Sequence, residues 1–258
     1  MLLAIDSGNT NTVFAIFEDN GNVLGVWRSS STPDRTADEH GIWLLQLLAL
    51  AGIEQTSVNS AIIATVVPTA LFALKTLCRT YFGADPLVIG DDDVEIGIDI
   101  LLDQPQELGA DRLVNAISAH QKYGGPLIVV DFGTATTFDV VDGDGNYAGG
   151  IITPGVNLSQ EALHMAAAKL PRVEIIRPEW VIGKGTVQAM QSGIYWGYLS
   201  MLEGVVKRIE KEFGSPMKVI ATGGLAPLFA KSTELIECAD AELTLRGLFA
   251  IYQLNTSS

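Results

Sequence analysis

The chain has 258 residues, of which 48% are hydrophobic, and it carries a formal net charge of −14 at pH 7. This length suits one large domain or two ordinary ones. The acidic balance argues against a protein that binds nucleic acid or anionic membranes through basic patches. Asp6 interrupts the apolar start of the chain, and no apolar run approaches the ~20 residues of a membrane span. We therefore expect a cytoplasmic protein with no nucleic-acid and no membrane partner.

The first half predicts a three-stranded meander followed by alternating helices and strands. The Asn-Gly pair within 19–22 is typical of a tight turn between antiparallel strands. Gly52 and Gly83 are typical of residues at or just beyond the end of a helix. The expected strands lie at 2–6, 12–17, 23–30, 60–67 and 86–90, and the expected helices at 37–52, 69–82 and 111–123.

The second half predicts the same plan again. Gly124 and Gly125 break the preceding helix, so we place a domain boundary there and expect domains at 1–123 and 124–258. Alternating strands and helices indicate an α/β fold, and the tight turns require antiparallel strands within each sheet. The expected strands lie at 126–131, 136–141, 147–153 and 218–224, and the expected helices at 157–170, 186–213 and about 241–252.

Two short stretches repeat one pattern, DSGNTNT at 6–12 and DFGTATT at 131–137. The first Asp of one copy is 125 positions from the first Asp of the other, and the last Thr residues of the two copies are separated by the same 125 positions. In each copy a buried strand ends in Asp and enters a turn of small residues. The N–H groups and hydroxyls of such a turn can hold phosphate oxygens without a lysine. The carboxylate suits a metal ion, bound directly or through water. The alternative is two ordinary hairpins with Asp and Gly in their turns.

Several further motifs follow in a fixed order: GADR at 109–112, GGIITPG at 149–155, AMQSG at 189–193 and ATGG at 221–224. With the repeated stretches, they make the chain resemble the superfamily of actin, heat-shock ATPases and sugar kinases, and within it the type III pantothenate kinase family. The resemblance covers the full length. It implies duplicated ribonuclease H-like (actin-like ATPase) domains with mixed sheets and ATP in the cleft between them. It also implies phosphorylation of pantothenate, the first step of coenzyme A biosynthesis.

The resemblance assigns roles to individual residues. Asp111 is implied as the base that accepts the proton of the pantothenate hydroxyl, although by itself it also fits a helix N-cap. Arg112 alone also fits a surface ion pair, and Thr186 alone fits a second N-cap. The implied pantothenate contacts are Gly109, Ala110, Asp111, Arg112 and Thr186, and the implied ATP contacts are Asp6, Ser7, Gly8, Asn9, Thr10, Asn11, Thr12, Val13, Gly133, Thr134, Gly223 and Gly224.

The family uses magnesium and a monovalent cation, potassium or ammonium, together with ATP. The resemblance places the monovalent cation at Asp131, and Asp6 is the candidate for hydrated magnesium. Gly223 and Gly224 would let adenosine approach the backbone, although the pair also fits a strand-to-helix turn. The two cysteines, Cys78 and Cys238, indicate thiols of a reducing compartment rather than a disulfide or a metal site.

Two features leave questions open. Gly193, Gly197, Ser200 and Gly204 form a stripe of small residues along the expected helix 186–213, which fits either a homodimer interface, as the resemblance implies, or internal packing. Leu102 stands where the family often carries Tyr, so we expect a changed pocket with retained activity. The rival functions are another small-molecule kinase of the superfamily and a non-catalytic ATP-binding regulatory protein.

Overall fold

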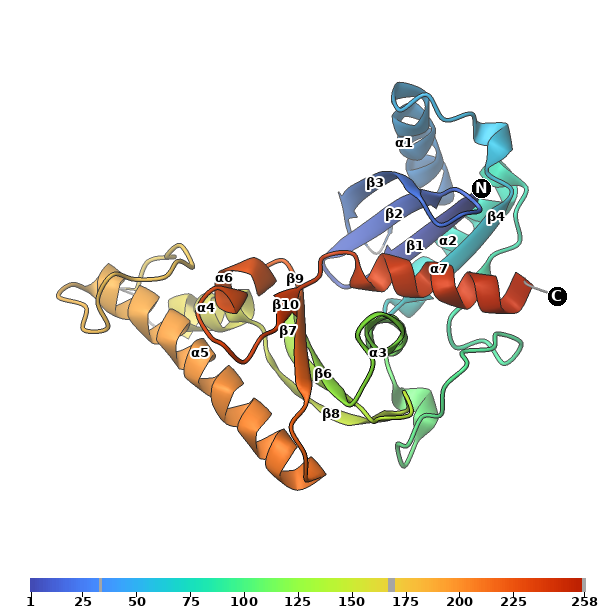
Figure 1. Cartoon of the computed structure of the whole chain (residues 1–258). Coiled ribbons are helices and arrows are strands. Elements are labelled where there is room, and N and C mark those ends of the chain that lie inside the picture. Colours follow the sequence, from blue (N-terminus) through green and yellow to red (C-terminus); the bar gives the residue numbers. More distant parts are fainter. Residues whose placement is uncertain (33, 167–169, 257–258) are drawn as a thin grey trace. The chain divides into compact units, whose positions relative to one another are not determined.

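The computed structural model describes residues 1–32, 34–166 and 170–256 and divides into two compact units (Figure 1). Unit 1 consists of residues 1–99, 103–118 and 242–258, and unit 2 of residues 100–102 and 119–241. The division of the sequence between residues 123 and 124 stays a prediction about the internal repeat. By contacts, the C-terminal segment belongs to unit 1 together with the first hundred residues.

Unit 1 is built on a mixed five-stranded sheet with the order β3-β2-β1-β4-β5. The first three strands are antiparallel, and β4 and β5 continue the sheet in parallel with β1. Its strands are β1 (Leu2–Ser7), β2 (Asn11–Phe17), β3 (Val23–Ser30), β4 (Ser60–Thr65) and β5 (Leu87–Val88), and its helical segments are α1 (Ala37–Leu50), η1 (Gln55–Ser57), α2 (Pro68–Phe82), η2 (Pro105–Glu107), the first part of α3 (Ala110–Tyr123) and α7 (Leu243–Thr256).

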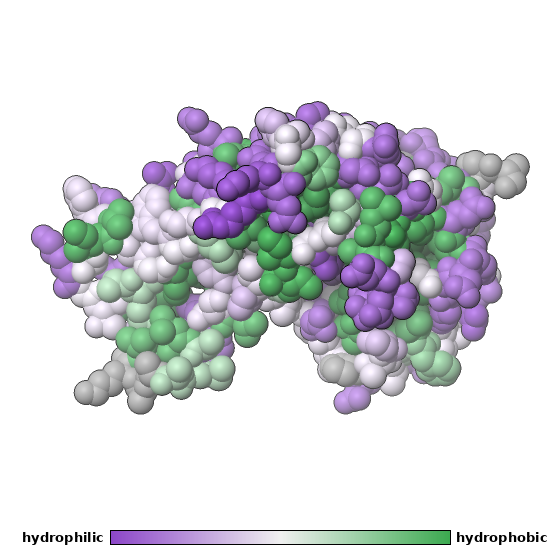
Figure 2. All heavy atoms as spheres, turned by 90° about the horizontal axis from the view of Figure 1, so that it is seen from below, coloured by the Kyte–Doolittle hydropathy of each residue, from purple (hydrophilic) through white to green (hydrophobic). Residues whose placement is uncertain are grey.

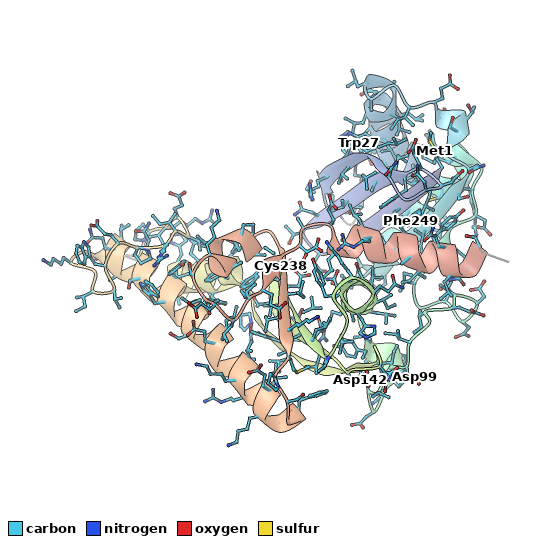
Figure 3. The ribbon with its side chains drawn as sticks, in the orientation of Figure 1. Met1, Trp27, Asp99, Asp142, Cys238 and Phe249 are labelled. Atoms are coloured by element: carbon cyan, nitrogen blue, oxygen red, sulfur yellow. The ribbon has the colours of Figure 1, made fainter. Side chains whose placement is uncertain are left out.

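Helices cover both faces of this sheet because β1 and β4 are apolar on both sides. On one face Phe14 and Ile16 pack with residues of α1 and α2 in a buried cluster. On the other face α7 lies along the strands, and Phe249 of α7 stacks on Phe17 with ring centroids 5.1 Å apart (Figure 3). The middle of the central strands is therefore sealed from water, and their end residues and turns reach the surface.

Unit 2 repeats the sheet with the order β10-β9-β6-β7-β8, in which β7, β6 and β9 take the places of β2, β1 and β4. Its core packs the long helix α5 against Val130, Phe132 and Phe138. The strands are β6 (Leu127–Phe132), β7 (Ala135–Val141), β8 (Tyr147–Pro154), β9 (Lys218–Gly223) and β10 (Cys238–Ala239), and the helices are the end of α3, α4 (Val156–Ala166), α5 (Thr186–Phe213) and α6 (Ala226–Ala230).

The expected α/β class with mixed sheets and every expected strand are confirmed. The long helix α5 has the predicted bounds, and it ends at Gly214 in the left-handed region with φ +88°. Both cysteines are free, with Cys78 buried. Several details differ: η1, η2, α6 and β10 were not predicted, β4 ends at Thr65 instead of residue 67, α7 runs on to Thr256, and Leu170 lies outside α4. The expected helix 157–170 also includes residues 167–169, which lie outside the described part of the chain.

The two meanders correspond through an offset that changes inside the first turn. Asp6 and Asp131 keep the offset of 125, but Ser7 pairs with Thr12 whereas Phe132 pairs with Thr136. Thr12 therefore corresponds to Thr136, and the sequence match of Thr12 with Thr137 is wrong by one residue. The reason is that the second turn is one residue shorter, and the shorter offset then persists through both third strands.

Among the described residues, no helix combines the length and apolarity needed to cross a bilayer. On the face drawn in Figure 2, hydrophobic side chains form separate patches between hydrophilic ones.

Candidate functional site

The β1–β2 turn lies at the carboxyl end of the central strand of unit 1. Asp6 pairs with Val13 of β2 and with Ala64 of β4, and its side chain is half-buried. The turn closes through a hydrogen bond from the Gly8 N–H to the Asn11 carbonyl, 3.0 Å long. Side chains at 9–11 are exposed, whereas Ser7 and Thr12 are buried. The turn therefore offers amides and hydroxyls to solvent from a rigid base.

The β6–β7 turn occupies the same place in unit 2. Asp131 pairs with Thr137 of β7 and with Thr222 of β9, and Gly133 donates its N–H to the Ala135 carbonyl at 3.0 Å. The carboxylate of Asp131 lies against Gly223, where a Cβ would come within 2.5 Å of Oδ1. Gly223, with φ +88°, ends β9 and leads with the exposed Gly224 into α6. The glycine pair thus forms a strand-to-helix turn beside the Asp131 carboxylate.

The GADR segment begins α3, and Asp111 is the second residue of that helix. The expected N-cap position is wrong by two residues, because Gly109 precedes the helix. The N–H of Arg112 donates to Asp111 Oδ1 at 2.8 Å. Burial raises the pKa of the Asp111 carboxyl above its usual value, and the N–H and positive charge of Arg112 partly offset that effect. A half-buried carboxylate with a raised pKa is a candidate acid-base group.

Gly109 makes room for this carboxylate. A Cβ at position 109 would lie 2.8 Å from Asp111 Oδ1 and 3.5 Å from a methyl group of Val66. Val66 in turn donates its N–H to the Ser7 carbonyl at 3.1 Å. Within unit 1, Val66 therefore connects the GADR segment to the end of β1, so the candidate base and the Asp6 turn lie at the same end of one sheet.

Thr186 belongs to unit 2 and lies at the exposed start of α5. Gly185 is the N-cap and Thr186 makes no capping hydrogen bond, so the interpretation of Thr186 as an N-cap is wrong. Thr186 lines a groove of about 780 Å³ between α4 and α5, together with Pro154, Met190, Gly193 and Gly197. A Cβ at Gly193 or Gly197 would meet no atom within 4 Å. The face of α5 at Gly193 and Gly197 is therefore open within the described chain, whereas a Cβ at Gly204 would lie 3.1 Å from the Arg208 guanidinium.

The possible ligands for cations are single carboxylates rather than a cluster. In residues 1–32, 34–166 and 170–256, no three His, Cys, Asp or Glu side chains are grouped so as to hold a metal ion. Asp6 and Asp131 each provide hard oxygen donors of the kind that magnesium and potassium prefer. Any cation at either position would have to complete its coordination with water, backbone carbonyls or a bound phosphate.

Ser31 and Val66 are neighbours of the site that sequence reasoning missed. Ser31 Oγ donates to the Gly8 carbonyl at 2.6 Å, and the Ser31 N–H donates to the Thr10 carbonyl at 2.9 Å. Neither residue belongs to a motif, because each contacts the site from a different strand end. Ser31 directly follows the expected strand 23–30, which was the signal available for it. Val66 lay within the expected strand 60–67, and only the observed end of β4 at Thr65 places it in the turn.

Comparison with protein families gives a match to the type III pantothenate kinase model over residues 2–208. A type III pantothenate kinase of Paramagnetospirillum magneticum is 64% identical over 257 residues, covering 100% of this chain and 98% of that protein. A type III pantothenate kinase of Rhodospirillum rubrum is 62% identical over 255 residues, covering 99% of both.

Solved structures with the same fold are much more distant in sequence. An activator of 2-hydroxyisocaproyl-CoA dehydratase from Clostridium difficile, solved with bound ADPNP, superposes with a TM-score of 0.56 at 12% identity and covers 97% of this chain and 93% of its own. A polyphosphate/ATP-glucomannokinase from an Arthrobacter species gives a TM-score of 0.50 at 15% identity, covering 99% and 98%. These likenesses support two ribonuclease H-like halves of the actin-like and sugar-kinase type.

Proposed function

The chain belongs to the type III pantothenate kinase family, and on that premise we propose that it transfers the γ-phosphoryl group of ATP to pantothenate. The product, 4'-phosphopantothenate, is the first intermediate of coenzyme A biosynthesis. The observation that carries this proposal is the full-length identity of 64% to a type III pantothenate kinase, with the GADR segment at the start of α3. The activity is that of a phosphotransferase with an alcohol acceptor.

Asp111 is the proposed catalytic base. Phosphoryl transfer passes through a loose transition state, so a carboxylate that orients the acceptor hydroxyl and accepts its proton is sufficient. Arg112 follows Asp111 and is proposed to bind the carboxylate of pantothenate, with Gly109 and Ala110 completing the wall of the substrate site. Thr186, on unit 2, is proposed as a further substrate contact.

ATP is proposed to bind through both repeated turns. Residues 6–13 on unit 1 and Gly133 and Thr134 on unit 2 would lie around its phosphates, and Gly223 and Gly224 would lie near adenosine. Binding of ATP by both turns is supported by their equivalent positions, at the carboxyl ends of β1 and β6. An acidic chain has few lysines to spare for a polyanion, so backbone amides are suitable donors.

Two cations are part of the proposal. Asp6 would hold hydrated magnesium, and Asp131 would hold potassium or ammonium. When bound, these ions would neutralise the phosphate charge that an acidic protein cannot balance alone. The support from the chain is the pair of carboxylates, each at the end of a central strand and beside a turn rich in N–H groups.

We also propose that the protein is a homodimer that acts in the cytoplasm. The open face of α5 at Gly193 and Gly197 would let a helix of a second copy approach closely. Two free thiols suit a reducing compartment.

The function is tested by incubating the purified protein with ATP, magnesium, potassium and pantothenate and detecting 4'-phosphopantothenate by mass spectrometry. A parallel panel of sugars and hydroxy acids tests the rival small-molecule kinases. Formation of phosphopantothenate above all other products is the expected result. ATP binding without phosphorylation of any acceptor would favour the non-catalytic regulatory protein instead. Omitting potassium, or replacing it with sodium, is expected to weaken ATP use.

A further inference from the structure

Three carbonyls in the bend of the β1–β2 turn, those of Gly8, Thr10 and Asn11, accept hydrogen bonds from the chain itself. The Gly8 carbonyl accepts from Ser31 Oγ at 2.6 Å, and the Thr10 carbonyl accepts from the Ser31 N–H at 2.9 Å. The Asn11 carbonyl accepts from the Gly8 N–H at 3.0 Å. Two of these three bonds come from one residue, Ser31, which directly follows β3.

This arrangement determines which groups the turn presents to a ligand. Carbonyl oxygens repel anions, whereas N–H groups and hydroxyls attract them. Ser31 holds the Gly8 and Thr10 carbonyls toward the body of unit 1. The exposed side of the turn therefore presents backbone amides and the side chains at 9–11. The Ser31 hydroxyl also contacts Thr12 Oγ1 at 3.0 Å, and Thr12 contacts Ser7 Oγ at 3.1 Å. This hydroxyl chain ties the turn to β1.

Unit 2 keeps one of the two Ser31 contacts, the bond from the backbone N–H. Gly155, which corresponds to Ser31, donates its N–H to the Thr134 carbonyl at 3.1 Å. The second turn is one residue shorter and lies closer to the end of β8. A Cβ at position 155 would overlap the Thr134 carbonyl and lie 2.7 Å from the Gly133 carbonyl oxygen. Glycine is therefore required at 155, and the serine hydroxyl has no counterpart there.

We propose that Ser31 and Gly155 are positioning residues for ATP. Each binds carbonyls of one phosphate-binding turn, Gly8 and Thr10 in the first and Thr134 in the second, so that these carbonyls point away from the nucleotide. The inference rests on the proposed function, since it assigns ATP to these turns. It adds a residue outside every motif, Ser31, and it gives Gly155 a role in the β6–β7 turn.

The test measures binding of a non-hydrolysable ATP analogue by calorimetry, together with the KM for ATP, the KM for pantothenate and kcat. Ser31→Ala loses one hydroxyl that serves the turn, so it should weaken analogue binding and raise the KM for ATP roughly 3- to 10-fold. The KM for pantothenate should stay unchanged. Ser31→Thr keeps the hydroxyl and should restore affinity. Ser30→Ala, at an exposed neighbouring position, is the matched control and should behave as the wild type.

Gly155→Ala tests the second turn in the same way, and it should weaken analogue binding at least as strongly because the new methyl group meets backbone. The inference is overturned if Ser31→Ala binds the analogue as tightly as the wild type, or if both KM values rise together. A wild-type protein that binds the analogue but does not phosphorylate pantothenate would contradict the proposed reaction and leave this binding test valid. A wild-type protein that binds no nucleotide would contradict both.

Discussion

The carboxylate of Asp131 occupies the space in which a side chain at Gly223 would begin, with only 2.5 Å between Oδ1 and the position of a Cβ. The two residues belong to neighbouring parallel strands, β6 and β9, and Asp131 pairs with Thr222. The missing side chain at 223 therefore sets where the Asp131 carboxylate can lie. Gly223 of the TGG motif therefore makes room for the Asp131 carboxylate on the neighbouring strand, and this role does not depend on a contact with adenosine.

Gly223→Ala should displace the Asp131 carboxylate and reduce kcat/KM for ATP roughly 100-fold, since ångström-scale displacement of a positioned group has effects of that size. Activation by potassium should weaken in parallel. Gly214→Ala is the matched control, because Gly214 has the same φ of +88° but no atom within 4 Å of the new Cβ. Both variants should lose about 1–3 kcal/mol of stability from backbone strain, and Gly223→Ala should lose more because its Cβ would also lie 2.7 Å from backbone atoms of Phe132. Equal kinetics in the two variants would contradict the link between Gly223 and Asp131.

Asp111→Asn should lower kcat by at least about 100-fold, as expected for loss of a general base, while ATP binding persists. Because the folded protein raises the Asp111 pKa through burial, the native state holds this proton more tightly than the unfolded state does. The charge at Asp111 therefore costs stability, and the cost is fully developed once the pH exceeds the folded pKa.

Asp111→Asn should thus become more stable relative to the wild type as the pH rises through the folded pKa of Asp111. Urea titrations at pH 4 to 8 measure this difference in stability, and the acid limb of the kcat profile should lie above the pKa of a free Asp. Full turnover in Asp111→Asn would remove Asp111 as the base.

His40 provides a second test of pH dependence. Its side chain is 6% exposed and packs against Phe14, and burial lowers its pKa to about 4. The neutral imidazole is therefore preferred in the folded state, and stability present above pH ~6.5 should be lost as the pH falls through 4. The loss should approach about 3 kcal/mol. His40→Leu should lose less stability than the wild type as the pH falls over this interval, and an acid sensitivity equal to that of the wild type would contradict the role of His40.

Thr12 and Thr136 form a natural pair for comparing one hydroxyl in two contexts. Thr12 Oγ1 contacts both Ser7 and Ser31, whereas Thr136 Oγ1 is buried without a hydrogen-bond partner among the described residues. The reason is that Phe132 and Gly155 occupy the positions of Ser7 and Ser31 in unit 2. Thr12→Val should cost about 1–2 kcal/mol, and Thr136→Val should be neutral or stabilising. Calorimetric unfolding measures both, and a larger loss at Thr136 would contradict this explanation.

Local patterns predicted the fold well because apolar periodicity and glycine positions carry most of the information about regular elements. The helix Thr186–Phe213 followed from an uninterrupted pattern ended by Gly214. The segments α6 and β10 are five and two residues long, too short for any period to appear. The similarity of the two motifs aligned Thr12 with Thr137, although Thr136 is the equivalent residue in the structure. The sequence alone does not show at which position the second turn is one residue shorter.

The site was predictable only where residues act within a motif. The turns and GADR could be named, since their residues are adjacent in the chain. Ser31 contacts Gly8 from 23 positions away, and the Asp131–Gly223 contact joins separate strands. Such contacts depend on sheet register, which neither composition nor spacing determines.

The open face of α5 leads to the last prediction, on the oligomeric state. A side chain at Gly197 would meet no atom of the described chain within 4 Å, so Gly197→Arg should leave the folded subunit intact. In a homodimer that uses this face, the same change places a long charged side chain in a close helix contact and should convert the dimer to monomers. Sedimentation equilibrium measures the mass. Glu212→Arg introduces the same side chain at an exposed position near the other end of α5, outside the groove, and is the control. If Gly197→Arg remains dimeric, the interface lies elsewhere. A monomeric variant that also loses affinity for pantothenate would indicate that the second copy helps to complete the substrate site near Thr186.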